Sequence, residues 1–533
     1  MSAFFDQCRL LGLTVIETEF EDYLQDESRF RGHADALVRP GTQAQVAEVV
    51  TLANGFNTRL TVVSGKTSLT GGPVPAGGAI LDLKGLERID PEDPSIVEPG
   101  VILRHYKDWV AARGLFFPPD PTSEESCTLG GAVACNASGA LSYLYGPTRD
   151  YVRGLKVVLP TGSVLEVMRG DVTSRDGVFM VPGHMLSPRQ QAGLVIPVPR
   201  IKSLPWRVCK NAAGIFSSHP MDLVDLFIGS EGILGVVVEI RTVLVPSRKP
   251  RFGLMLYLST LERTVEVVTL LDVLRRLFHD KDITAKGSVE GVLRELGIAD
   301  FAALDRFSRV FPSCMEWFHR SVADLLSPDR ARRLRDYYGT LYIEQEYSEN
   351  QGLMESAEHW AELVELLNAS DEGQSLPIKT EVGLDEKQIR SLKTERKGVP
   401  EKLNERIQPG MVKMAMDFSV PVEHLKRLLE LYDRKLPSGR AYIFGHIGNA
   451  HLHVNLLPQN TKEQEEDGLL YMDLAREVCS MGGSVSGEHG IGKLKHEALE
   501  IMLGAEGIEE IRRLKKIMDP NGILNIGNMV SMS

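Results

Sequence analysis

Three histidines stand close together in one short stretch of the chain, at positions 446, 451 and 453. The stretch consists of two β-like runs joined by a turn, and if that turn centres on Asn449-Ala450, His446 faces His453 across a hairpin. Their Cβ atoms would then lie about 5 Å apart, and the period-two rule puts His451 and Asn455 on the same face. Neutral imidazoles suit zinc, manganese or iron, so the hairpin is a candidate metal site. Histidines that only hydrogen-bond are the alternative.

A glutamate and a histidine are paired between glycines in a second stretch, Ser486-Gly487-Glu488-His489-Gly490-Ile491-Gly492. The glycines allow a tight turn that presents Glu488 and His489 outward. Glu488 would complete a His-His-carboxylate set with open positions for substrate, which is typical of a catalytic metal site. His489 would then be free to act as a general base. A plain surface loop is the alternative.

Three other segments are rich in glycine and further small residues: 62–72, 118–150 and 226–237. Small residues let backbone N–H groups approach a phosphate closely, and Ser and Thr hydroxyls add donors. The first segment contains neither G-x-x-x-x-G-K-[ST] nor G-x-G-x-x-G, so it supports neither a P-loop nor a nicotinamide Rossmann site. Together the segments suit a long ligand laid against exposed backbone.

In order and spacing, these three segments resemble the FAD domain of the vanillyl-alcohol-oxidase type, in the branch that oxidises D-2-hydroxy acids. That branch includes D-lactate dehydrogenases, the glycolate oxidase flavoprotein subunit and D-2-hydroxyglutarate dehydrogenase. The hairpin also resembles the branch at G-H-x-G-x-x-x-x-H, and the turn at G-E-H-G-x-G. The resemblance runs from about Arg39 to the end of the chain and is weaker over 170–210 and 280–340.

The resemblance implies FAD, bound without a covalent link because the first loop has neither His nor Cys. The residues expected to hold its pyrophosphate are Ser64, Gly65, Lys66, Thr67, Ser68 and Leu69. Further FAD contacts are expected from Asp120, Thr128, Gly131, Asn136, Gly139, Glu231, Val237 and the near-terminal Asn525. Lys66 departs from the consecutive glycines of the family, and either adds a charge to the pyrophosphate or points to solvent.

The resemblance also assigns roles around the histidines. It implies a divalent metal (zinc, manganese or iron) on His446, His453 and Glu488, and His489 as the general base. Arg396 and Asn455 would touch the substrate, with Lys413 a further candidate. His451 stands where relatives often carry Asn, so it is either an extra ligand or a determinant of substrate choice.

The implied reaction is FAD- and metal-dependent oxidation of a D-2-hydroxy acid, of D-lactate or glycolate type, to the 2-oxo acid. The proton would go to His489 and the hydride to flavin N5, and electrons would pass to a separate iron–sulfur protein or electron-transfer flavoprotein. One alternative is an FAD-dependent transferase of alkylglycerone-phosphate-synthase type. Another is a flavoprotein subunit that is active only in a glycolate-oxidase-like complex. The sequence does not decide the oligomeric state, and a homodimer is one possibility.

Composition narrows the classes of protein. Lys plus Arg number 60 against 72 Asp plus Glu in 533 residues, a formal charge of −12, which disfavours a nucleic-acid partner. The 6 cysteines include no C-x-x-C pair, so neither a zinc knuckle nor an iron–sulfur cluster is expected. Low cysteine content and the lack of a signal-peptide pattern favour a cytoplasmic protein, with a peripheral position at a membrane left open. We expect no transmembrane segment, because no run of about 18 apolar residues occurs.

The order of glycine-rich, β-branched and helix-periodic segments, together with the family resemblance, predicts an α+β protein. We expect a two-part FAD-binding domain, a ferredoxin-like antiparallel-sheet cap domain and a C-terminal helical segment. The expected divisions are a lead-in over 1–35, the FAD domain over 36–248, the cap over 249–483 and the tail over 484–533. A proline-rich insertion at about 170–210 reads as an ordered insertion or a lid-like loop.

Hydrophobic periodicity places the elements that must position these residues. Strands are predicted over 60–64, 79–83, 152–159, 164–167, 234–245, 253–258, 339–346, 412–418 and 440–446. Helices are predicted over 43–54, 102–113, 260–278, 351–367, 385–406 and 421–434. In the cap, the helices are expected to cover one face of the sheet.

Overall fold

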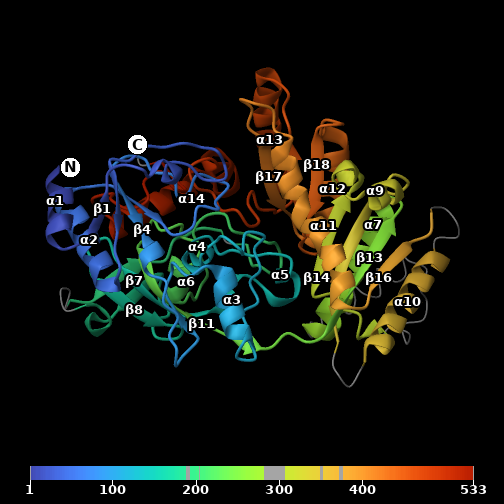
Figure 1. Cartoon of the computed structure of the whole chain (residues 1–533), viewed down its shortest axis with the longest axis horizontal. Helices are drawn as coiled ribbons and strands as arrows, with labels where there is room; N and C mark the ends of the chain where they lie inside the picture. The colour runs from blue at the N-terminus through green and yellow to red at the C-terminus, as the bar shows by residue number, and fades with distance from the viewer. Residues whose placement is uncertain are drawn as a thin grey trace.

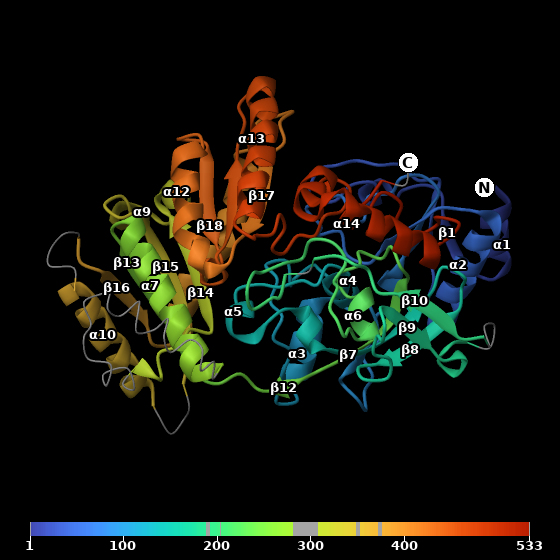
Figure 2. The ribbon, with the colours of Figure 1, turned by 180° about the vertical axis from the view of Figure 1, so that it is seen from behind.

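The computed structural model describes residues 2–187, 192–202, 204–280, 307–347, 352–370 and 376–531. Two lobes lie side by side (Figure 1): the N-terminal half and the C-terminal helix form one, and a large sheet with its helices forms the other. Seen from behind, an extended segment crosses between the lobes after β12, Val245–Pro246 (Figure 2).

The first lobe begins with a four-stranded sheet of order β1-β2-β4-β3, in which β2, β4 and β3 are parallel and β1 is antiparallel. The elements are α1 (Ser2–Leu10), β1 (Thr14–Ile16), β2 (Ala36–Arg39), α2 (Gln43–Phe56), β3 (Leu60–Val63) and β4 (Ala79–Asp82). Helix α2 begins where the Thr42 hydroxyl accepts from the Gln45 N–H, and it ends at Asn57 in the left-handed conformation.

A second, antiparallel sheet of order β5-β11-β7-β8 completes the lobe, and its Val158, Val236 and Val238 share a hydrophobic core with α1 and α2. The helices of this part are α3 (Leu103–Ala111), α4 (Leu129–Ala134), α5 (Ser142–Tyr145) and α6 (Leu223–Phe227). The strands are β5 (Ile96–Val97), β6 (Leu115–Phe116), β7 (Val152–Val158), β8 (Val164–Met168) and β11 (Val236–Thr242).

The proline-rich insertion contains an antiparallel pair, β9 (Val178–Val181) with β10 (Leu194–Pro197). Residues 188–191 and 203 of the insertion lie outside the described part of the chain. Its last residues run against the other lobe, since the Ala212 N–H donates to the Ser486 carbonyl at 2.8 Å.

The second lobe is built on a seven-stranded sheet of order β16-β13-β15-β14-β18-β19-β17, antiparallel throughout. Its strands are β13 (Arg251–Leu258), β14 (Cys314–His319), β15 (Gly339–Glu346), β16 (Lys379–Gly383), β17 (Met414–Ser419), β18 (Ala441–Gly445) and β19 (His451–Leu456). Strand β14 was not predicted, although all six of its residues are buried near the middle of the sheet.

The helices of this lobe are α7 (Leu261–Leu274), α9 (Pro328–Leu334), α10 (Leu353–Ser370), α11 (Glu386–Glu405), α12 (Leu425–Lys435) and α13 (Thr461–Ser480). The expectation that helices cover one face of the sheet is wrong. Leu254 and Leu256 of β13 join a core with α7 and α12, whereas Met255 and Tyr257 join another with Leu392 of α11. Because side chains alternate along a strand, both faces of this sheet are apolar and both are covered.

The tail carries the chain back to the first lobe, where α14 (His496–Met518) lies beside the N-terminal elements (Figure 1). The Leu60 N–H donates to the Ile523 carbonyl at 2.6 Å, and the Asn525 N–H donates to the Leu60 carbonyl at 2.9 Å. The end of the chain thereby extends the first sheet beside β3. Among the described residues, no helix is both long enough and apolar enough to cross a membrane.

Candidate functional site

The histidine hairpin differs from its predicted register. Strand β18 ends at Gly445 and β19 begins at His451, so residues 446–450 form the loop, and Phe444 rather than His446 lies opposite His453. The predicted pairing is wrong because a helical turn and Ala450, at φ 45°, lengthen the loop. The loop folds back, however, and the ring centroids of His446 and His453 are 5.3 Å apart.

The Glu-His turn docks on the edge of the same sheet. Residues Ser484 and Ser486 form bridges with Ser419 and Asp417 of β17, and the Gly487 N–H donates to the Asp417 carbonyl at 2.7 Å. A Cβ on Gly487 would lie 2.6 Å from the His451 ring, so only glycine allows this approach. The turn therefore brings Glu488 and His489 to the hairpin histidines.

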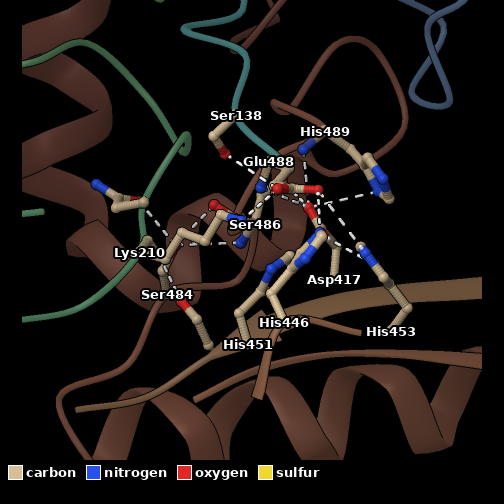
Figure 3. A network of polar contacts seen from close by, with 12 residues as sticks. Ser138, Lys210, Asp417, His446, His451, His453, Ser484, Ser486, Glu488 and His489 are labelled. Atoms are coloured by element: carbon tan, nitrogen blue, oxygen red, sulfur yellow. Dashed lines mark hydrogen bonds and ion pairs between the residues drawn. The ribbon is translucent and has the colours of Figure 1, made fainter. Parts of the chain in front are cut away.

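Both hairpin histidines present the same ring nitrogen to Glu488 (Figure 3). Nε2 of His446 lies 3.2 Å from Glu488 Oε2, and Nε2 of His453 lies 3.7 Å from the same oxygen. A carboxylate faces Nδ1 of each ring: Glu316 contacts His446, and Asp417 Oδ1 lies 3.4 Å from His453. Carboxylates in this position fix the tautomer and leave Nε2 free for a metal. Two imidazoles and a carboxylate, supported in this way, fit a divalent cation.

His451 belongs to the same group. One ligand atom from each of His446, His451, His453 and Glu488 lies within 4.8 Å of the others. Burial lowers the pKa of His451 to about 3, so its ring is neutral. Its Nε2 lies 2.7 Å from Asp417 Oδ1, and its buried Nδ1 has no hydrogen-bond partner among the described residues. In this structure His451 therefore engages Asp417 through Nε2.

Sequence reasoning missed a lysine at this site. Lys210, whose side chain is 0% exposed, pairs through Nζ with Glu488 Oε1. The Ser138 hydroxyl donates to the same oxygen at 3.1 Å, and Lys210 Nζ also donates to the Gly139 carbonyl at 3.4 Å. The two oxygens of Glu488 are thus divided: Oε1 faces the first lobe and Oε2 faces the histidines. Lys210 comes from the end of the proline-rich insertion, which carried no motif.

Charged groups of both signs meet at the site. Three carboxylates, Glu316, Asp417 and Glu488, face two buried ammonium groups, Lys210 and Lys495, and Glu316 and Glu488 raise the pKa of His446 against the effect of burial. Burial alone would raise the pKa of Glu488, yet His446 and Lys210 hold that pKa well below its usual range. Glu488 is therefore ionised, and a divalent cation could take the place of the proton that His446 holds between Glu316 and Glu488.

His489 is placed to accept a proton. Its ring stacks on His453 with centroids 5.2 Å apart, and its Nδ1 lies 3.4 Å from Asp417 Oδ2. Burial lowers the pKa of His489 to about 4, so the ring is neutral near pH 7. Among the described residues, none hydrogen-bonds to its Nε2, which leaves that atom for a ligand.

The three residues that are expected to contact the substrate lie on different elements of the second lobe. Asn455 lies on β19, two residues beyond His453 and thus on the same face. Arg396 falls within α11, but its side chain lies outside the described residues. Lys413 lines a cleft of about 1190 Å³ between the lobes and donates to Asn404 Oδ1 at 2.6 Å. Burial lowers the pKa of Lys413 to about 8.

The residues expected to bind FAD come together from four separate segments. Ser64 Oγ lies 2.7 Å from Thr128 Oγ1, which joins the first glycine-rich segment to the second. The Glu231 N–H donates to the Ala134 carbonyl at 2.9 Å, which joins the second to the third. Asn525 accepts from the Val62 N–H and donates to the Glu231 carbonyl, both at 2.7 Å, so the tail connects the first and third.

The backbone in these segments is strained where FAD contacts are expected. Asn136, Glu231 and Asn525 have positive φ, at 49°, 50° and 43°. Such conformations cost energy outside glycine and concentrate at ligand sites. A Cβ on Gly139 would lie 2.1 Å from the Asp120 carbonyl oxygen, so this chain crossing requires glycine. These residues fit a ligand held close to the backbone.

Of the remaining expected FAD contacts, some are engaged elsewhere. The Lys66 ammonium pairs with the Asp22 carboxylate and lies 4.4 Å over the Tyr23 ring, so its charge is directed to the N-terminal segment. The Glu231 carboxylate accepts from the backbone N–H groups of Ile491 and Gly492 at 2.7 and 2.8 Å. The Glu231 carboxylate thus holds the backbone that follows Glu488 and His489 in the turn.

The remaining residues that are expected to contact FAD lie in the glycine-rich segments and on β11. The Gly131 N–H donates to Thr128 Oγ1 at the start of α4, Asp120 Oδ1 accepts from the Leu141 N–H, and Val237 lies on β11. The first-loop residues Gly65, Thr67, Ser68 and Leu69 follow β3 directly and are partly exposed.

Comparison with known families identifies both lobes. The profile described as FAD binding domain matches residues 34–168, and that described as FAD linked oxidases, C-terminal domain, matches residues 301–529. The chain belongs to the FAD-linked oxidases. In this FAD-linked oxidase, the first match contains the first two glycine-rich segments. The second match contains the histidine hairpin and the Glu-His turn.

Named relatives agree with this membership. The glycolate oxidase subunit GlcD of Bacillus subtilis is 25% identical over 515 residues, covering 94% of this chain and 90% of the relative. The D-lactate dehydrogenase of Anaerostipes hadrus is 26% identical over 526 residues, covering 96% and 92%. The D-2-hydroxyglutarate dehydrogenase of Stutzerimonas stutzeri is 26% identical over 510 residues, covering 93% and 90%.

Among solved structures, an alkyldihydroxyacetonephosphate synthase is similar with a TM-score of 0.63. It shares 14% sequence identity, and the match covers 98% of this FAD-linked oxidase and 84% of that chain. At that identity the likeness concerns the fold alone. Together with the two family matches, it supports an FAD domain of vanillyl-alcohol-oxidase type with a separate second lobe.

Proposed function

We propose that this FAD-linked oxidase oxidises a 2-hydroxy acid to the 2-oxo acid, with a divalent cation on His446, His453 and Glu488. The observation that carries the proposal is the approach of both histidine Nε2 atoms to one oxygen of Glu488, with a carboxylate facing Nδ1 of each ring. The three relatives above act, by their names, on glycolate, D-lactate and D-2-hydroxyglutarate.

The chemistry requires removal of a hydroxyl proton and of a hydride from the same carbinol. When bound, a divalent cation would lower the pKa of the substrate hydroxyl. His489 takes the proton at Nε2, since its ring is neutral near pH 7 and Nδ1 faces Asp417. Asn455, on the face shared with His453, and Arg396, on α11, contact the carboxylate end of the substrate.

When bound, FAD would supply the two-electron acceptor for the hydride. The chain's own part is to cradle the cofactor where the glycine-rich segments and the tail meet, beside Ser138 and Gly139, which contact Glu488 and Lys210. A separate iron–sulfur protein or electron-transfer flavoprotein would then accept the electrons.

The transferase alternative has weaker support. It rests on the fold shared with alkyldihydroxyacetonephosphate synthase at 14% identity. A reading as a subunit of a larger complex rests on the name of one relative, a glycolate oxidase subunit. That reading keeps the same site and differs only in the need for a partner, so assays with a soluble dye and with a clustered partner separate the two.

The decisive test is anaerobic bleaching of the flavin by a panel of 2-hydroxy acids: glycolate, D-lactate, L-lactate and D-2-hydroxyglutarate. We expect rapid bleaching by at least one D-acid or by glycolate. Absence of bleaching by every acid, in protein that carries both FAD and zinc, would refute the proposal.

Two perturbations test the named residues. His489→Ala is expected to keep the flavin spectrum but to slow bleaching by at least 100-fold, because the transition state loses its base. Exhaustive chelation is expected to stop bleaching while the flavin spectrum persists, and zinc or manganese should restore it. Full activity in metal-stripped protein would contradict the metal role.

A further inference from the structure

We infer that Asp417 is the positioning residue of the active site: one of its oxygens builds the Glu-His turn and the other sets the tautomer of the metal-binding histidine His453. The inference rests on the proposed function, because it concerns how the metal site is prepared. Asp417 lies on β17, at a position where the sequence carries no motif, and its side chain is 0% exposed.

One oxygen of Asp417 receives the turn. Oδ2 accepts the backbone N–H groups of Glu488 at 3.0 Å and His489 at 2.8 Å, and it lies 2.8 Å from the Ser486 hydroxyl. Two backbone donors therefore converge on this oxygen, and the single proton of the Ser486 hydroxyl goes either to it or to the Gly490 carbonyl, also at 2.8 Å. The Glu-His turn is therefore presented to the hairpin by Asp417.

The other oxygen faces the hairpin histidines. Oδ1 lies 2.7 Å from His451 Nε2 and 3.4 Å from His453 Nδ1. An acceptor in front of His453 Nδ1 favours the tautomer protonated there, which leaves the lone pair of Nε2 directed toward Glu488 Oε2, 3.7 Å away. Only that tautomer can bind a metal through Nε2.

The surroundings keep Asp417 in its ionised form. Burial would favour the neutral acid, but the backbone donors on Oδ2 and the buried ammonium group of Lys495 favour the carboxylate. Lys495 Nζ lies 3.9 Å from Oδ2. A donor on the Oδ2 side would displace the backbone N–H groups of the turn, whereas the histidines on the Oδ1 side can move their ring protons and accept instead.

Asp417→Asn separates the two roles. The turn presents two backbone N–H donors, so the amide oxygen must stay on the Oδ2 side, and the NH₂ group then faces His451 and His453 as a donor. His453 would have to accept at Nδ1 and carry its proton on Nε2, where it blocks the metal. The turn and the His489 contact would persist, because their acceptor remains.

The experiment uses the full-length, FAD-loaded chain and measures zinc affinity by competition with a chromophoric chelator. We expect the zinc dissociation constant of Asp417→Asn to rise by about 10–100-fold, with the flavin spectrum unchanged. Asp467→Asn is the matched control, because Asp467 is equally buried in the second lobe but pairs with Arg440. Its zinc affinity should equal that of the native protein. A zinc affinity of Asp417→Asn within about threefold of native overturns the inference.

A second measurement needs no variant and covers the case in which Asp417→Asn does not fold. In zinc-loaded native protein labelled with ¹⁵N at histidine, the ring of His453 should carry its proton on Nδ1 and bind zinc through Nε2. A proton on Nε2 would overturn the inference while leaving the proposed function intact. Native protein that binds no zinc overturns both.

Discussion

The ion pair between Lys210 and Glu488 makes a prediction about stability that depends on the metal. Lys210→Met removes the ammonium group from Glu488 Oε1 and leaves an apolar side chain of similar length in its place. Glu488 keeps the Ser138 hydroxyl at 3.1 Å and His446 Nε2 at 3.2 Å, so it is not left without partners. Its charge, however, loses a buried counter-ion.

The magnitude follows from the burial of the pair, whose side chains are 0% and 10% exposed. Removing one partner of a buried ion pair costs about 3–5 kcal/mol, and the remaining hydrogen bonds favour the lower end, about 3 kcal/mol. For a lobe of about 200 residues this lowers the melting temperature by roughly 6–12 °C. A divalent cation on Oε2 would supply the missing positive charge, so zinc should stabilise the variant more than the native protein.

The assay is thermal unfolding of chelator-treated and zinc-loaded protein, with both forms carrying FAD. Lys435→Met serves as the control, because Lys435 pairs with Asp473 at 2.5 Å but both side chains are partly exposed, so the loss should stay below about 1 kcal/mol. If the metal-free Lys210→Met protein melts within about 2 °C of native, the pair contributes nothing and the reasoning fails. An equal zinc-induced gain in both proteins would refute the compensation.

Three further predictions concern other parts of the chain. Burial lowers the pKa of His319 to about 4, so the unfolded chain takes up the proton first as pH falls. The free energy of unfolding should therefore drop by about 2 kcal/mol between pH 7 and pH 5 through this residue. Urea unfolding should give a smaller drop in His319→Gln, and an equal drop would contradict the assignment. Gly139→Ala places a Cβ 2.1 Å from the Asp120 carbonyl oxygen and should lower FAD affinity by at least tenfold in a flavin-release titration, whereas Gly468→Ala, with open space around it, should not. Asn525→Leu breaks both hydrogen bonds that join the tail to Val62 and Glu231, at a cost of about 2–4 kcal/mol. Its urea midpoint should fall accordingly, and an unchanged midpoint would show that the tail is held by other contacts.

The sequence predicted those parts of the molecule that depend on local patterning. The strand over 339–346 and the helix over 385–406 follow from periodicity, and the structure has them at Gly339–Glu346 and Glu386–Glu405. The glycines around Glu488 and His489 allow the tight turn that the structure has there. Motifs of this kind specify their own backbone, so they can be recognised without a structure.

The hairpin register was not predictable at the same level. Ala450 adopts the left-handed conformation, with φ 45°. A glycine or asparagine at this position would have predicted that conformation, but an alanine does not. A turn centred on Asn449-Ala450, one residue later than the observed centre of the loop, was thus the simpler prediction, and it put His446 opposite His453. The rings meet nonetheless, because the loop folds back over the face on which His451 and His453 lie.

The groups that hold the catalytic residues carry no local signal at all. Glu316 lies on a strand with no alternation, since every residue of β14 is buried, and Asp417 and Lys210 are single charged residues in apolar surroundings. The roles of these three residues become evident only in the folded structure, where β14, β17 and the end of the insertion meet at the Glu-His turn. Pairing of charges across hundreds of residues is a property of the fold and not of any window of sequence.

The division of Glu488 between two lobes has a consequence for how the enzyme is assembled. Its Oε2 faces the histidines of the second lobe, whereas its Oε1 is held by Ser138 and Lys210 of the first, next to the Gly139 crossing that FAD would need. Any ligand that orders the Ser138–Gly139 segment also fixes Oε1, and fixing Oε1 orients Oε2 for the cation. We therefore expect flavin and metal to raise each other's affinity, and by the same factor, because coupling between two binding equilibria is reciprocal. Such a coupling would depend on the Glu-His turn, whose backbone N–H groups donate to Asp417 and Glu231.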